Sequence, residues 1–177
     1  VPGKNYHEVG GTTNTDRDVH NLIEKFKPHI SFTKEEETQG KEILKKYEIP
    51  EDAKFVCLIA RDSAYLDRNK DQTLADWNYH SYRDVDIDNY LLAAEELATR
   101  GYYVFRMGNK VLKPLKSSNP KIIDYANSEM RSDFMDIYLG AKCSFCISTL
   151  LGFDGIPHIF RKPIVYTNVV PFGNMST

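Results

Sequence analysis

The chain has 177 residues, of which 41% are hydrophobic and 27% are charged, so it is long enough for one buried core and has an ordinary globular composition. Its formal net charge of -2 gives no overall attraction to nucleic acid or anionic membranes, although a local basic cleft can still hold a phosphate. No apolar stretch reaches the roughly 20 residues that a bilayer-crossing helix needs, so we expect a cytoplasmic protein without a transmembrane segment in this chain.

The first half of the chain predicts a lead-in, a helix and a buried strand. Residues 1–30 are rich in Gly, Thr, Asn and Asp, and we expect a linker that leads into one domain spanning residues 31–177. Thr33 followed by Glu36 is the signature of a capping box, and the helix after it is expected to end before Pro50. The continuously apolar residues 55–60 predict a strand that is covered on both faces.

The second half predicts alternating helices and strands after a long polar loop at residues 61–85. Apolar residues recur at helical spacing over residues 87–98, and Gly101 is expected to end this helix. Further helices are expected from Ser132 to about Leu139, with Gly140 as the stop, and at residues 153–160. Strands are expected at residues 102–105, 122–123, 143–147 and 164–167. This alternation requires crossover connections, so the sequence predicts an α/β fold with a doubly wound, Rossmann-like parallel sheet.

The three cysteines are predicted to be buried thiols. Their number is odd, and Cys57 and Cys146 fall inside apolar strand-like runs. Cys143 and Cys146 have the spacing of a redox or zinc pair, but the chain lacks a second pair of this kind. We therefore expect no metal site and no disulfide.

Polar residues follow the predicted strands where ligands bind in open parallel sheets, beyond the carboxyl ends of the strands. Arginine forks, hydroxyl groups and backbone N–H groups suit a pyrophosphate, and glycines allow close backbone approach. Alternatively, the two arginines form ion pairs with Asp62 and Asp124, and Ser148 acts as a cap. The candidate residues are Arg61, Asp62, Ser63, Arg106, Gly108, Ser148, Thr149, Gly152 and Asp154.

The long loop adds a second group of candidates. Arg83, Tyr82 and His80 form a polar aromatic cluster that either closes over a ligand or packs as an ordinary loop. His80 and His158 are candidates for a base or a base-stacking group, and also for ordinary structural histidines. The chain has neither a GxGxxG fingerprint nor a Walker lysine loop, so it lacks the usual equipment for NAD binding or P-loop phosphoryl transfer.

Five ordered segments within residues 50–173 resemble a family of bacterial glycosyltransferases. They are residues 55–63, 80–90, 101–108, 131–140 and 146–149. A strand that ends in Arg, followed later by a strand that ends in Ser-Thr, is also similar to the donor-binding half of GT-B fucosyltransferases. Those enzymes commonly have His before the Arg and Gly before the acid, whereas Ala60 and Asp62-Ser63 stand here. The resemblance therefore does not extend to a fucosyl donor specifically.

The resemblance implies that this chain is the C-terminal, donor-binding half of a GT-B enzyme that works on bacterial surface polysaccharide. It implies a nucleoside-diphosphate sugar as donor, a glycan acceptor, and no cofactor or obligatory metal. Arg61 and Arg106 would hold the diphosphate, Ser148 and Thr149 would supply hydroxyl or backbone contacts, and Asp154 would meet the ribose or base. Two alternatives stay open: a pyruvyl transferase with the same plan, and a non-catalytic module that binds nucleotide or carbohydrate.

Overall fold

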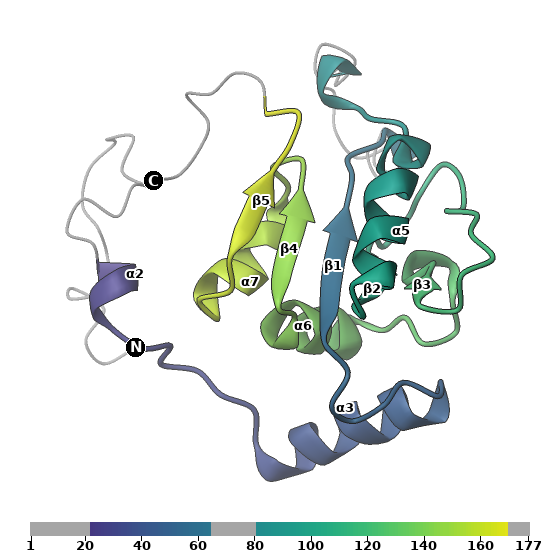
Figure 1. The fold of residues 1–177 in the computed structure, drawn as a ribbon. Helices are drawn as coiled ribbons and strands as arrows, with labels where there is room; N and C mark the ends of the chain where they lie inside the picture. Colours follow the sequence, from purple (N-terminus) through teal and green to yellow (C-terminus); the bar gives the residue numbers. More distant parts are fainter. Residues whose placement is uncertain (1–21, 65–80, 170–177) are drawn as a thin grey trace.

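The computed structural model describes residues 22–64 and 81–169, and its centre is one sheet of five parallel strands (Figure 1). The strand order is β3-β2-β1-β4-β5, and every neighbouring pair is parallel. The α/β prediction with a parallel sheet is confirmed, and the order is compatible with a Rossmann-like fold. The strands are β1 (Phe55–Ile59), β2 (Tyr103–Arg106), β3 (Ile122–Ile123), β4 (Phe145–Ser148) and β5 (Ile164–Tyr166).

Helices cover both faces of the sheet, as a doubly wound arrangement requires. Helix α5 lies in front of the sheet in Figure 1, and α6 and α7 lie behind it. None of the helices formed by the described residues is both long enough and apolar enough for a membrane crossing. The helices are α2 (Leu22–Lys25), α3 (Lys34–Lys46), α5 (Leu91–Thr99), α6 (Asp133–Lys142) and α7 (Gly155–Ile159), with 3-10 turns η2 (Ile87–Tyr90), η3 (Tyr125–Asn127) and η4 (Gly152–Asp154).

Alternating side chains of the strands divide the core into two parts. Cys57 and Phe105 point to one face and pack in a cluster with Leu139 of α6. Leu58 and Val104 point to the other face and pack with α5. Because successive side chains of a strand point to opposite faces, this division also fixes which face each residue at a strand end belongs to.

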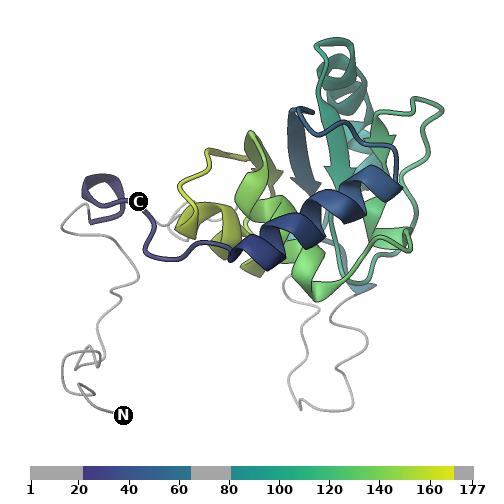
Figure 2. The same cartoon turned by 90° about the horizontal axis from the view of Figure 1, so that it is seen from below.

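Helix α3 begins where the sequence predicts. The Oγ1 atom of Thr33 accepts a hydrogen bond from the backbone N–H of Glu36 at 3.2 Å, and the Glu36 carboxylate accepts one from the N–H of Thr33 at 2.7 Å. These two bonds satisfy N–H groups that the first turn leaves without partners. Helix α3 runs past α6 (Figure 2), and a Cβ on Gly40 would lie 2.4 Å from the Tyr138 ring. Gly40 therefore allows the two helices to approach closely.

The predicted end of α6 at Gly140 is wrong, because the helix continues to Lys142. A Cβ on Gly140 would lie 2.8 Å from Cγ2 of Ile156 in α7. The glycine is thus explained by the close packing of α6 and α7 and does not mark a helix end. Cys143 caps α6 instead of opening the next strand, which begins at Phe145.

The prediction that the three cysteines are buried thiols is confirmed. Cys57, Cys143 and Cys146 are all free and buried. Cys57 and Cys146 face each other on the neighbouring strands β1 and β4. Loss of water around these thiols raises the pKa values of Cys57 and Cys146, so both are held in the neutral form that suits a core.

Candidate functional site

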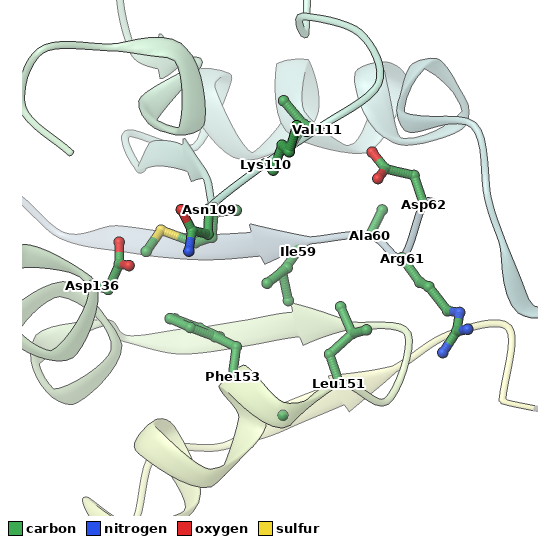
Figure 3. A pocket seen from close by; sticks show the side chains of 13 residues that line it. Ile59, Ala60, Arg61, Asp62, Asn109, Lys110, Val111, Asp136, Leu151 and Phe153 are labelled. Carbon is green, nitrogen blue, oxygen red and sulfur yellow. The ribbon is translucent and has the colours of Figure 1, made fainter. Parts of the chain in front are cut away.

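A cavity of about 290 Å³ lies at the carboxyl ends of the central strands (Figure 3). We call it the switch cavity, because the chain leaves β1 toward one side of the sheet and β4 toward the other. In open parallel sheets, such switch points are where ligands bind. The cavity is lined by Ile59 at the end of β1, residues 60–62 after it, residues 107–111 after β2, Asp136 of α6 and residues 151–153 after β4.

Arg61 is fixed at the end of β1 by two contacts. Its backbone N–H donates to the hydroxyl of Thr149 at 2.8 Å, and its Nε donates to Asp84 at 3.0 Å. The side chain is 13% exposed and points past the end of β4 in Figure 3. Nearby, Arg83 donates from Nη2 to the carbonyl oxygen of Leu150 at 2.8 Å. Arg61, Arg83 and Thr149 thus join the loops after β1 and β4, and of the three only Arg61 lines the cavity.

The turn after β4 is held by buried polar groups. The hydroxyl of Ser148 accepts a hydrogen bond from the N–H of Leu150 at 3.2 Å, and Leu150 has a φ of 64°, which is uncommon outside glycine. Asp154 is 5% exposed and accepts from the N–H of Leu151 at 2.8 Å. Desolvation raises the pKa of Asp154 above its ordinary value of 3.8. Ser148 and Asp154 therefore stabilise this turn, and neither lines the switch cavity.

Arg106 lies at the same edge of the sheet as Arg61, but it is on the α5 face and does not line the switch cavity. It is the last residue of β2 and shares the α5 face with Val104, whereas the next residue, Met107, lines the switch cavity. Its Nη1 donates to Asp124 at 3.1 Å, and its Nη2 lies 3.9 Å from Asp62. Both arginines therefore form ion pairs, as the alternative interpretation predicts. Arg106 has the two suggested partners, Asp62 and Asp124, and Arg61 pairs with Asp84 instead.

Of the remaining candidates after the strands, Asp62, Gly108 and Gly152 line the cavity. Asp62 accepts from the N–H of Ala64 and from the N–H of Leu112, both at 3.0 Å, and so ties the loop after β1 to the loop after β2. Gly108 has a φ of 150°, and its Cβ would lie 2.7 Å from Val111, so the turn itself explains this glycine. A Cβ on Gly152 would meet no atom within 4 Å. Ser63 does not line the cavity.

Two charged residues of the cavity are absent from the sequence prediction. Lys110 is exposed, and among the described residues no carboxylate lies within ion-pair distance of it. Asp136 accepts hydrogen bonds from the hydroxyl of Tyr125 at 2.7 Å and from Arg131 at 2.9 Å. Burial and the neighbouring carboxylate raise the pKa of Tyr125, so its hydroxyl stays a proton donor. Lys110 lies in the loop after β2, so the rule that ligands bind beyond the carboxyl ends of strands could have identified it. Asp136 lies on helix α6, where that rule does not apply.

In the described part of the chain, neither the histidines nor the other side chains that commonly bind metals form a further site. His158 lies on α7 and does not line the switch cavity, and His80 falls outside the described residues. Within residues 22–64 and 81–169, no three His, Cys, Asp or Glu side chains are grouped as metal ligands would be.

Comparisons with known proteins add no family assignment. No protein-family model matches the sequence. No curated protein matches it either. A search of the solved structures also finds no match. The glycosyltransferase resemblance of the sequence motifs therefore stays a prediction.

Proposed function

We propose that this chain is the donor-binding domain of a nucleotide-sugar glycosyltransferase that acts on a glycan or surface polysaccharide. The observation that carries the proposal is the position of the switch cavity at the carboxyl ends of β1, β2 and β4. A nucleotide in an open parallel sheet binds at this place, where the connections of neighbouring strands separate. With about 290 Å³, the cavity is at the lower end of the size range of ligand pockets.

The cations of the cavity support a diphosphate as part of the ligand. Arg61 and Lys110 both line it, and they come from different loops. Asp84 partly neutralises Arg61, so Lys110 is the cation whose charge is most available to a phosphate. Arg106, which the sequence motif assigns to the diphosphate, lies on the other face of the sheet, and Lys110 takes its place in this proposal.

The apolar and carboxylate groups suit the nucleoside part. Leu151 and Phe153 offer apolar surface on one side of the cavity, and Asp136 lies at the α6 end (Figure 3). A carboxylate accepts hydrogen bonds from hydroxyl groups, and ribose offers two of them. Because Arg131 and Tyr125 already fix the Asp136 carboxylate, little conformational entropy is lost when a hydroxyl binds to it.

The chemistry that this arrangement would serve is sugar transfer with electrostatic assistance. The bond between the anomeric carbon and the diphosphate oxygen breaks, the acceptor oxygen bonds to the anomeric carbon, and the acceptor hydroxyl gives up its proton to a base. Negative charge grows on the leaving diphosphate. Arg61 and Lys110 would stabilise that charge, as pre-arranged cations do in other active sites.

A binding experiment with a matched pair of lysine variants tests the proposal. Lys110→Ala removes the cation from the cavity, and Lys116→Ala removes an exposed lysine of the same loop that does not line it. We expect UDP or GDP to bind the unaltered chain and Lys116→Ala equally, in the presence of EDTA, and to bind Lys110→Ala about tenfold more weakly, a loss of about 1.4 kcal/mol. Equal binding to both variants, or no binding of any nucleotide, would contradict the proposal.

A further inference from the structure

A second cavity of about 290 Å³ lies on the α5 face of the sheet, opposite the switch cavity. We call it the α5-side cavity. Residues 84–87, Arg106, and residues 112–113 line it together with Ala60 and Asp62. Ala60 and Asp62 also line the switch cavity, so the two cavities meet at the residues that follow β1.

Arg106 gives the α5-side cavity a buried donor with unused hydrogen-bonding capacity. The residue is 1% exposed. Its Nη1 donates to Asp124, but its Nε has no hydrogen-bond partner among the described residues. Its Nη2 is 3.9 Å from Asp62, which is longer than a hydrogen bond. A guanidinium carries five N–H donors, and leaving them without acceptors in a buried place is costly. A ligand oxygen that reaches Nη2, beside Asp62 in the lining, would relieve part of this cost.

The charges of the α5-side cavity disfavour an anionic ligand. Each cation is matched by carboxylates: Lys113 contacts Asp86 at 2.6 Å and Asp88 at 2.7 Å. Arg106 has two carboxylates near its guanidinium, at 3.1 Å and 3.9 Å. The lining contains three aspartates, Asp62, Asp84 and Asp86, against Arg106 and Lys113. A phosphate would meet a net negative lining, whereas a neutral ligand would not be repelled.

Uncharged hydroxyl groups fit this mixture of donors and acceptors. A hydroxyl can donate to an aspartate and accept from the guanidinium at the same time. The same lining includes the apolar side chains of Ala60, Ile87 and Leu112, which can cover the C–H face of a ring. From the buried donors of Arg106, the surplus of carboxylates and these apolar walls, we propose that the α5-side cavity binds an uncharged saccharide ring.

This inference deepens the proposed function and rests on it for the link between the two cavities. The saccharide has two possible sources, which share the same chemistry: the sugar of a nucleotide-sugar donor, or a free glycan. Because Ala60 and Asp62 belong to both linings, a donor whose nucleotide fills the switch cavity would pass these residues to place its sugar in the α5-side cavity.

The test follows backbone amide signals of the full chain by two-dimensional NMR. The probes are the free monosaccharides glucose, galactose, fucose and N-acetylglucosamine, and separately pyrophosphate, UDP, and a UDP-sugar. We expect at least one monosaccharide to shift the amide signals of Val85, Ile87 and Leu112 in a saturable titration, while pyrophosphate does not. Signals that move with pyrophosphate instead, or with none of the sugars, would overturn the inference.

Two tryptophan variants separate occupancy of the cavity from general effects. Leu112→Trp places a large ring at the mouth of the α5-side cavity, and Leu112 is 64% exposed, so the fold should tolerate the change. Leu92→Trp is the control, since Leu92 is 83% exposed on α5 and lines neither cavity. The monosaccharide response should be lost in Leu112→Trp and kept in Leu92→Trp; a response kept in both would overturn the inference.

The same spectra distinguish failure of this inference from failure of the proposed function. UDP should move the signals of Gly108 and Gly152 in the switch cavity. A sugar response without a UDP response contradicts the proposed function alone, and a UDP response without a sugar response contradicts the inference alone. If the UDP-sugar moves both sets of signals where UDP moves one, the donor is the source of the saccharide.

Discussion

The buried pair of Arg106 and Asp124 gives the sharpest prediction about stability. Arg106 is 1% exposed, and Asp124 is its hydrogen-bonded partner at 3.1 Å. The Asp124 carboxylate also accepts from the N–H of Leu115 at 3.2 Å and from the side chain of Asn127 at 2.7 Å. Asp124→Asn keeps the size of the side chain but removes its charge, so it leaves the buried guanidinium with Asp62 alone, at 3.9 Å.

The expected loss in the free energy of unfolding is about 3 kcal/mol. Removing one partner of a buried ion pair costs about 3–5 kcal/mol, because the other charge stays buried without compensation. We expect Asp124→Asn at the lower end of this range, because Asp62 remains 3.9 Å from Arg106. Two unit charges about 4 Å apart attract each other by about 4 kcal/mol at an effective dielectric constant of about 20, so Asp62 still compensates part of the guanidinium charge. The pair of Arg131 and Asp133 has a similar distance of 2.9 Å, but the Asp133 side chain is 94% exposed. Asp133→Asn should therefore cost at most about 1 kcal/mol.

Urea unfolding of the two variants and the unaltered chain measures both values. The slope of the transition should stay the same, so that a change in midpoint reports stability. The reasoning would be refuted if Asp124→Asn and Asp133→Asn had the same small effect, because Arg106 would then not depend on its buried partner. Replacing both Arg106 by Met and Asp124 by Leu should recover part of the loss, since no buried charge is left at that position.

Three further predictions concern packing, capping and pH. Gly40→Ala should lower stability, because overpacking against Tyr138 costs about 1–3 kcal/mol. In a Tyr138→Ala background the same change should stabilise the chain by up to about 1 kcal/mol, because Ala has the higher helix propensity. Thermal unfolding of the four proteins shows whether the sign of the effect reverses. Thr33→Ala should cost about 1 kcal/mol in urea unfolding through loss of the capping box, and no loss would contradict the cap. Burial raises the pKa of Asp154, so between pH 3.8 and this raised pKa the folded chain binds more protons than the unfolded chain. The free energy of unfolding should therefore fall as pH rises through this window. Asp154→Asn should remove that decline, and an unchanged pH profile in the variant would contradict the prediction.

Much of the fold could be predicted from the sequence because its signals are local. The apolar run at residues 55–60 marks β1 within one residue, and the capping box at Thr33 marks the start of α3. Gly101 follows α5 as expected and has a φ of 92°, which explains why a glycine stands there. The prediction for Gly140 is wrong, because the sequence alone does not distinguish a glycine that ends a helix from one that allows two helices to pack closely.

The candidate site was harder to predict than the fold, because side-chain direction depends on register. Arg61 and Arg106 both follow apolar runs, and the sheet does bring their strands side by side. Arg106 is the last residue of β2 and lines the cavity on the α5 face, whereas Arg61 follows β1 and lines the switch cavity. Asp136 was missed, since it reaches the switch cavity from α6 and only the three-dimensional packing shows this. His80 lies outside the described residues and stays a prediction.

The proposed function depends on the claim that a nucleoside diphosphate binds in the switch cavity, and Gly152 forms part of the lining of this cavity. Isothermal titration of UDP and GDP into Gly152→Ala and Gly155→Ala tests it most directly, because neither added Cβ meets any atom within 4 Å, while only Gly152 lines the cavity. We predict that Gly155→Ala binds nucleotide like the unaltered chain and that Gly152→Ala binds it much more weakly at unchanged stability. Equal nucleotide affinity in both variants would contradict the claim.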